Sequence, residues 1–143
     1  MAMLKTKYYL LLLLALGLLA CNSSRNNQLL QHKKWRVYDV QVPAGAPYDI
    51  TQVSQATELK RGYYSDVYYQ FLDDNLFIAT IAGQPDSGRY QLLSNGRIIS
   101  ITASNGQRNA EHLVTIVHLD DNSFDMKVKS GEYDFVLKTK AEQ

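Results

Sequence analysis

The sequence predicts an all-β protein, an eight-stranded antiparallel up-and-down β-barrel with one short helix after the first strand. From residue 35 onward, apolar and polar residues alternate with the period of two that is typical of half-buried strands. Short turn segments separate these stretches, so consecutive strands should pair as hairpins. Eight is also the number at which a sheet closes into a narrow barrel. A two-sheet sandwich is the alternative, but its crossovers need longer connections than most of those here.

The first strand is expected over residues 35–42, WRVYDVQV, because it is rich in β-branched and aromatic residues and stops at Pro43. The long connection over residues 43–64 follows it. Within this connection Asp49 can cap a helix over residues 49–61, which ends at Gly62 and carries Ile50, Val53 and Leu59 at helical spacing.

The remaining strands follow from alternation and turn chemistry. They are expected over residues 65–72, 76–82, 89–94, 97–103, 112–119, 123–129 and 133–140. Tight turns are predicted over residues 73–75, 94–96 and 120–122. The other connections, over 43–64, 83–87, 104–111 and 130–132, include every long loop. Because successive connections of a meander alternate between its two ends, all the longer ones should gather at one end. Both chain ends of the barrel should lie at the tight end.

Residues 1–20 have the features of an export signal. Lys5 and Lys7 form a positive start, and residues 8–19 form an apolar stretch too short to be a membrane span. The only cysteine, Cys21, follows Leu18-Leu19-Ala20. This segment resembles the lipobox of bacterial lipoproteins, which implies cleavage before Cys21 and attachment of fatty acids, such as palmitate, to that residue. The alternative is a simple secretory signal beside a free thiol.

The chain therefore divides into a signal peptide over residues 1–20, a lipid-anchored polar tether over 21–34 and a barrel domain over 35–143. Asn22 stands next to the expected anchor in place of the aspartate that retains some lipoproteins in the inner membrane. The tether also has no early acidic run. The sequence thus predicts a lipoprotein attached to the periplasmic face of the bacterial outer membrane.

Charge and motif content narrow the function. The chain has 15 basic and 14 acidic residues, and removing the signal with its two lysines leaves 13 against 14, a balance that argues against nucleic acid as a partner. No nucleophile elbow, phosphate-binding loop or zinc-protease motif is present, so no enzymatic activity and no cofactor are expected. His112 and His118 are expected on one strand face, roughly 20 Å apart, too far to share a metal ion.

Four segments together resemble the lipocalin-like domains of small bacterial lipoproteins. They are the tryptophan that opens the first strand, YYQFLDDNLF, SGRYQLLSNGRIISIT and HLVTIVHLDDNSFDMKV, and the resemblance covers residues 33–140. It implies a calycin-type barrel and carries over no catalytic residue. Lys33 and Asn75 replace glycines of the pattern, and no arginine near the C-terminus is placed to stack on Trp35.

Two groups of residues are candidates for ligand binding. Large side chains of the barrel interior could line an apolar pocket or equally fill a small barrel: Tyr69, Phe71, Phe77, Tyr90, Phe124, Met126 and Phe135. A mouth could form at the end with the long loops, from Tyr48, Tyr63, Tyr64 and the loops around Gln84 and Asn105. The alternative for Tyr63 and Tyr64 is that they pack the helix onto the barrel.

Two functions remain open. The first is binding of a small apolar ligand, as a carrier or sensor. The second is a non-enzymatic, structural or accessory role in an outer-membrane protein assembly. The second is suggested because the fifth and sixth strands are apolar on both faces, with Ile98, Ile99, Val114, Ile116 and Val117. The helix over residues 49–61 or a partner protein could cover the resulting outer stripe.

Overall fold

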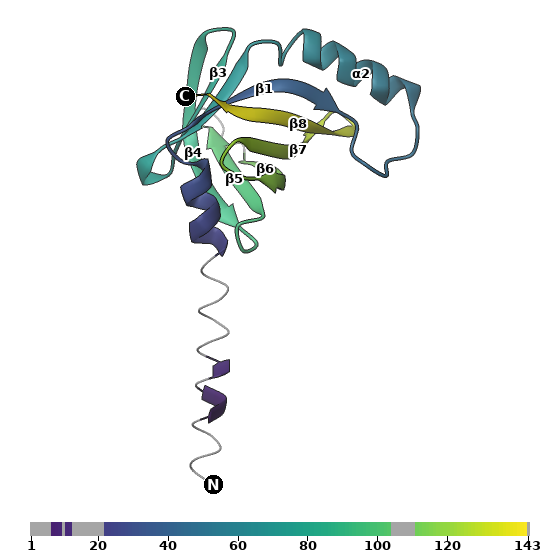
Figure 1. Ribbon diagram of the computed structural model, residues 1–143. Helices are drawn as coiled ribbons and strands as arrows, with labels where there is room; N and C mark the ends of the chain where they lie inside the picture. The colour runs from purple at the N-terminus through teal and green to yellow at the C-terminus, as the bar shows by residue number, and fades with distance from the viewer. Residues whose placement is uncertain (1–6, 10, 13–21, 104–110, 143) are drawn as a thin grey trace.

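The computed structural model describes residues 7–9, 11–12, 22–103 and 111–142, and within them eight strands form a closed antiparallel barrel (Figure 1). Each strand pairs with the next along the chain, and the last pairs with the first. The predicted fold class is therefore confirmed, including the helix after the first strand. The elements are β1 (Lys34–Gln41), α2 (Ile50–Arg61), β2 (Val67–Phe71), η1 (Asp73–Asn75), β3 (Leu76–Ile81), β4 (Gln84–Leu93), β5 (Ile98–Ala103), β6 (Glu111–Leu119), β7 (Ser123–Ser130) and β8 (Tyr133–Glu142).

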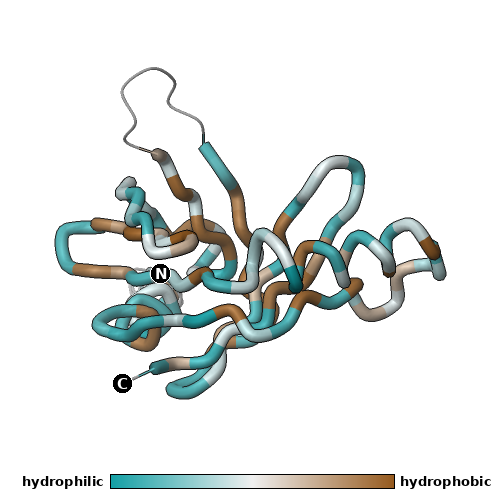
Figure 2. Tube along the Cα trace, turned by 90° about the horizontal axis from the view of Figure 1, so that it is seen from above, coloured by the Kyte–Doolittle hydropathy of each residue, from teal (hydrophilic) through white to brown (hydrophobic). Residues whose placement is uncertain are grey.

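Alternation along the strands produces the core. Hydrophobic and hydrophilic residues succeed each other along the tube in Figure 2, and cross-strand pairing brings the hydrophobic ones to the inner face. Trp35 of β1 lies opposite Tyr69 of β2, and the ring of Trp35 meets Phe124 edge-on at 5.6 Å. The fully buried side chains include Leu30, Trp35, Phe71, Phe124, Phe135 and Leu137.

The two ends of the barrel differ as predicted, with one correction. Lys34 pairs with Glu142, so both chain ends of the barrel lie at the end with the tight turns, the closed end. At the opposite, open end, however, β3 and β4 are joined by the two residues Ala82 and Gly83, and the loop expected over residues 83–87 is part of β4. The connection expected over 104–111 lies outside the described residues as far as residue 110.

The missed hairpin has a physical explanation. Ala82 and Gly83 both have positive φ, 50° and 78°, as a two-residue turn of this kind requires, and alanine gives no sequence signal for such a conformation. Pro85 suggested a break because it cannot donate a backbone hydrogen bond. It is accommodated because, among the described residues, β5 pairs with β4 only from Gly88 onward, and the Gln84–Ser87 segment pairs with β3.

Residues 22–30, expected within a flexible tether, instead form a helix against the closed end (Figure 1). Leu30 is fully buried beneath it, and the Trp35 indole Nε1 donates a hydrogen bond to the Leu30 carbonyl oxygen at 2.9 Å. The Tyr90 hydroxyl donates to the Asn27 Oδ1 at 2.7 Å. The helix thus closes this end of the barrel. Polar residues that we expected in a flexible tether instead form hydrogen bonds to the barrel.

The first turn of this helix packs directly on the turn between β4 and β5. The Asn26 side-chain amide donates to the Gly96 carbonyl oxygen at 2.9 Å. Gly96 has φ +81°, and a Cβ added there would stand 3.0 Å from the Ser23 Cα. Glycine is therefore required at position 96 by both the backbone conformation and the close approach of the helix.

Helix α2 lies along β1, where Asp49 caps it by accepting a hydrogen bond from the Thr51 backbone N–H at 2.8 Å. Its buried residues are Gln52 and Ala56, whereas Ile50, expected on the packed face, is 64% exposed. The helix is only weakly amphipathic, so spacing alone misidentified its inner face. It does not cover β5 and β6, and the outward side chains of Leu113 and Val117 on β6 stay exposed.

Strand β6 contains a bulge, because its pairing with β7 shifts register between Ile116 and His118. His118 therefore pairs with Asp125 on the outer face, while His112 pairs with Ile101 on the inner face. The prediction that the two histidines share a face is wrong, since one extra residue reverses the alternation.

A cation does lie over Trp35, although no C-terminal arginine provides it. The Lys33 Nζ stands 5.4 Å from the centre of the indole and 3.2 Å from the Asp121 Oδ1. Lys33, which replaces a glycine of the pattern, thus places a positive charge over the indole from two residues before Trp35.

Candidate ligand-binding cavity

A cavity of about 450 Å³ opens at the end of the barrel opposite the helix over residues 22–30. Its volume lies within the range of roughly 300–1,000 Å³ that is usual for small-molecule sites. The barrel interior is therefore filled at the closed end and hollow at the open end, which combines the two alternatives derived from the sequence. The lining residues are Tyr63, Tyr64, Tyr69, Phe71, Phe77, Ile99, Ile101, Glu111, His112, Leu113, Val114, Met126, Val128 and Lys129.

The floor of the cavity is apolar. Phe71, Phe77, Ile99 and Met126 are all buried and belong to the same core cluster. The rings of Phe71 and Phe77 are 5.3 Å apart, and the ring of Tyr69 stacks on Phe77 at 5.8 Å with an interplanar angle of 23°. These contacts separate the hollow half of the barrel from the filled half.

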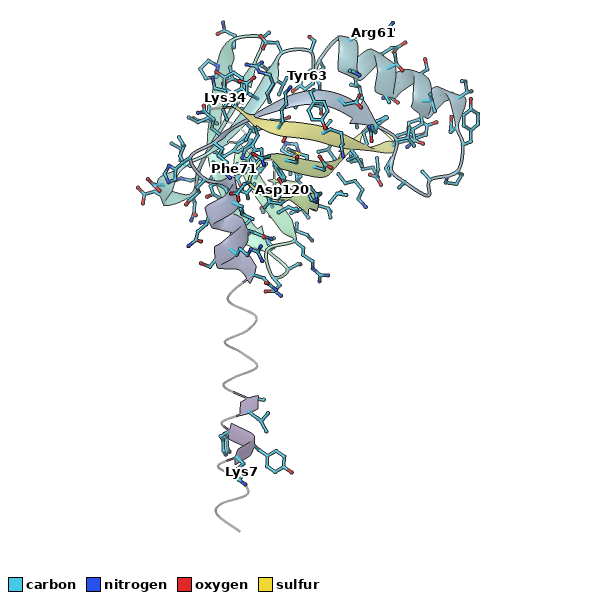
Figure 3. The ribbon with its side chains drawn as sticks, viewed as in Figure 1. Lys7, Lys34, Arg61, Tyr63, Phe71 and Asp120 are labelled. Carbon is cyan, nitrogen blue, oxygen red and sulfur yellow. The ribbon has the colours of Figure 1, made fainter. Side chains whose placement is uncertain are left out.

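Three phenol groups occupy one side of the cavity. Tyr63 and Tyr64, just before β2, meet edge to face at 4.8 Å, and Tyr69 follows on the inward face of β2. Figure 3 shows Tyr63 near the end of α2 and Phe71 much closer to the helix over residues 22–30. Tyr63 is exposed at the rim, whereas Tyr64 packs against the core, so the phenols extend from the mouth inward.

Burial raises the pKa of the two inner phenols, Tyr64 and Tyr69, above the ordinary value for tyrosine. It raises the pKa of Tyr64 to about 12, and the charge of an ionised Tyr63 adds to the effect. Burial also raises the pKa of Tyr69 strongly, followed by the charges that Tyr64 and Tyr63 would carry. The hydroxyl groups of Tyr64 and Tyr69 therefore remain hydrogen-bond donors throughout the physiological pH range.

The other ionisable lining residues are at the rim. His112 is the one whose strand position faces inward, opposite Ile101. Glu111 accepts a hydrogen bond from the Ser100 hydroxyl at 2.5 Å on the outer face, and Lys129 pairs across strands with Asp134. The depth of the cavity thus holds apolar and phenolic groups, and charge is confined to its edge.

The structure brings six of the nine predicted binding residues to the cavity wall, namely Tyr63, Tyr64, Tyr69, Phe71, Phe77 and Met126. The other three, Tyr90, Phe124 and Phe135, lie in the filled core. Their burial is almost complete, and the Tyr90 hydroxyl is occupied by the helix over residues 22–30. Whether the six bind a ligand stays a prediction.

The expected mouth is only partly formed by the residues named for it. Tyr48 is exposed before α2, and neither it nor Gln84 lines the cavity, while Asn105 lies outside the described residues. Sequence reasoning missed the contribution of β5 and β6, which provide Ile99, Ile101, His112 and Val114. The apolar residues of these two strands are visible in the sequence, but we interpreted them as evidence for an apolar outer stripe rather than as a wall of the cavity.

The described residues offer binding groups rather than a metal centre. No cluster of three or more histidine, cysteine, aspartate or glutamate side chains within residues 22–103 and 111–142 could hold a metal ion. None of the helices in the described ranges is both long and apolar enough to span a membrane.

Two solved structures are similar to the chain. One is a lipocalin-like protein from Bacteroides uniformis, with 17% identity and a TM-score of 0.47, in a match that covers 77% of this chain and 96% of that one. The other is an uncharacterized protein from Bacteroides eggerthii, with 16% identity and a TM-score of 0.47, covering 75% and 96%. No protein-family model and no curated protein sequence matches the chain. The barrel assignment rests on the strand pairing of the protein itself.

Proposed function

We propose that the protein is a lipid-anchored lipoprotein of the outer membrane that binds a small apolar ligand in the cavity at the open end of its barrel. The observation that carries the proposal is the cavity of about 450 Å³ with its floor of buried apolar side chains. Burial of each methylene group of a ligand contributes about 0.8 kcal/mol, so a medium-length aliphatic chain gains enough for micromolar binding. The proposal is of a binding protein, without cofactor or catalytic residues.

The anchoring part of the proposal is supported by the sequence around Cys21. The residue follows an apolar segment with a positive start, and the helix that begins at residue 22 leads directly to the closed end. An acyl group on Cys21 would therefore hold the closed end near the bilayer, at the periplasmic face. The cavity would open away from the membrane.

Ligand binding is tested by filling the cavity. The mature chain, from residue 21 and with Cys21→Ser, is titrated with the fluorescent apolar probe Nile red. We expect saturable binding that Ile101→Trp weakens by at least about tenfold, because the indole occupies the space that the probe needs. The matched control is Thr115→Trp, on the outer face of β6, which should bind as the parent does. Absence of saturable binding by the parent would refute the proposal.

Anchoring is tested separately in cells. Labelled palmitate should be incorporated into the full chain, and Cys21→Ser should abolish both the label and the retention of the protein in the outer-membrane fraction. Equal membrane retention of the serine variant would contradict a lipid anchor at this residue.

The accessory role in an envelope assembly is favoured by one separate observation, the exposed side chains of Leu113 and Val117 on the outer face of β6. If this face contacts another protein, Val117→Ser should release the partner from the purified protein; Leu113 is left unchanged because it also lines the cavity. Ile50→Ser, which removes an equally exposed aliphatic side chain from α2, is the matched control. A partner retained equally by both variants would exclude this surface.

A further inference from the structure

We infer that the ligand of the cavity carries a neutral carbonyl oxygen, which accepts a hydrogen bond from the Tyr69 hydroxyl while an aliphatic chain fills the rest of the cavity. This inference rests on the proposed function and names the class of ligand. Ketones, esters and lactones with a hydrocarbon chain belong to this class.

The first step is that Tyr69 is a fixed part of the cavity wall. Its backbone lies between Trp35 of β1 and Ala79 of β3, and its ring stacks on Phe77. The side chain of Ala79 is small, so it leaves room for the Tyr69 ring on the inner face of the barrel. A hydroxyl held on so constrained a ring has a defined position in the cavity.

The second step is that this hydroxyl has no protein partner among the described residues. Two other tyrosines show what a satisfied hydroxyl looks like here. The Tyr90 hydroxyl contacts Asn27 and Gln31 at 2.7 and 3.1 Å, and the Tyr133 hydroxyl donates to the Asp49 carboxylate at 2.8 Å. None of the side-chain hydrogen bonds within the described ranges uses the Tyr69 hydroxyl.

The third step is that the hydroxyl is open to the cavity rather than sealed in the core. Across the described part of the chain, the side-chain polar atom that is fully buried without a partner is the Asp125 Oδ1, on the outer face of β7. Tyr69 lines the cavity, and the space in front of its hydroxyl is therefore accessible to a ligand atom. A ligand that fills the cavity displaces water from this hydroxyl, so it must replace the lost hydrogen bond or leave the hydroxyl unpaired.

The fourth step concerns what the ligand must supply. Among the described residues, the inner wall offers the protonated hydroxyls of Tyr64 and Tyr69 and no carboxylate, because the Glu111 side chain is engaged by Ser100 on the outer face. An amine or ammonium of a ligand would find no strong acceptor in that part of the wall. A carboxylate at the Tyr69 hydroxyl would be buried without a described cation beside it, since His112 and Lys129 are at the exposed rim. A neutral carbonyl oxygen meets neither difficulty.

The experiment compares ligands that share a hydrocarbon chain and differ at one end. Methyl octyl ketone, decane and decanoate compete with Nile red for the mature Cys21→Ser chain, and the same set is run on Tyr69→Phe. Tyr48→Phe is the matched control, since that hydroxyl is exposed outside the cavity. We expect Tyr69→Phe to weaken binding of the ketone about five- to tenfold more than binding of decane, which is the usual contribution of one hydrogen bond. The ratio of the two affinities is compared between parent and variant because decane and the ketone differ in their own hydration.

The outcomes separate the two proposals. If neither decane nor the ketone competes, the proposed binding function fails. If Tyr69→Phe weakens decane and the ketone equally, or if decanoate binds best, the binding function stands and the inference is overturned. A direct readout covers the case in which Tyr69→Phe folds poorly. The stretching frequency of a labelled ketone carbonyl should be lower when it is bound to the parent than when it is dissolved in hexane, and a hexane-like frequency in the bound state would equally overturn the inference.

Discussion

The indole nitrogen of Trp35 donates its hydrogen bond to the backbone carbonyl oxygen of Leu30, and both residues are completely buried. The bond joins the first strand to the helix over residues 22–30. A segment that precedes the barrel in sequence is thereby part of its core, and its removal or distortion should affect the stability of the whole domain.

The first prediction concerns this contact. Leu30→Ala should lower the free energy of unfolding by about 2–5 kcal/mol, because it leaves a cavity beneath the helix at a site with no exposure. Leu29→Ala makes the same chemical change next to it, at a partly exposed position, and should cost less than about 1.5 kcal/mol. Urea unfolding of both variants measures the difference, and equal losses would mean that the helix is not docked as described.

The second prediction concerns the close approach at Gly96. Gly96→Ala and Gly131→Ala both place alanine at positive φ, but only the first adds an atom within 3.0 Å of a backbone carbon, that of Ser23. We expect Gly96→Ala to cost at least about 1 kcal/mol more than Gly131→Ala. Hydrogen exchange of residues 22–30 should also become faster in the first variant alone. Identical exchange in the two variants would argue against the packing of the helix on this turn.

The third prediction concerns the buried ion pair on the outer face. The Asp125 side chain is 8% exposed and pairs with the Lys138 ammonium, while its second oxygen has no partner among the described residues. Lys138→Met should therefore destabilise the protein by about 3–5 kcal/mol, since it leaves a buried charge unpaired. Lys140→Met, on the same strand, is the control and should cost little. Adding Asp125→Asn to Lys138→Met should restore most of the loss, and no restoration would contradict the charge-based explanation.

The fourth prediction concerns acid stability. The backbone N–H groups of Asn122 and Ser123 and the His118 ring lower the pKa of Asp120 from 3.8 to about 2. A lowered pKa in the folded state means that the contribution is present above pH 3.8 and is lost as the pH falls toward 2. Asp120→Asn cannot titrate, so the difference in urea midpoint between parent and variant should shrink over this interval. A difference in urea midpoint that does not change over this interval would contradict the assignment.

The β-barrel could be predicted because its signals are local. Asn95 and Gly96 are residue types that readily adopt the positive φ of their turn, and the Asp120 carboxylate accepts a hydrogen bond from the backbone of its own turn. Period-two alternation identified the strands between the turns. Where such signals are absent, prediction failed. Ala82 adopts the left-handed conformation without being a residue that favours it, and the bulge in β6 adds a residue that no motif announces.

The helix over residues 22–30 and the cavity depend on contacts between distant segments. Asn26 and Asn27 look like tether residues until Gly96 and Tyr90 are brought beside them by the barrel. Likewise, Tyr90 and Phe124 are large aromatic residues in predicted strands, as Tyr69 and Phe77 are, so the sequence does not distinguish the two pairs. Only the packing of the folded barrel, such as the contact of the Tyr90 hydroxyl with Asn27, decides which side chains are enclosed in the core and which line the cavity.

The docked helix also bears on how cargo would reach the protein. If Cys21 is acylated as proposed, the docked helix described from residue 22 would hold the closed end near the lipid surface, and the entrance would lie on the order of 20–25 Å farther out, the height of a tilted strand. A hydrophobic compound dissolved in that same bilayer then has no direct passage into the protein. Delivery must come from the aqueous side or from a second protein that presents the compound to the rim, and loading should depend on that donor more than on the lipid beneath.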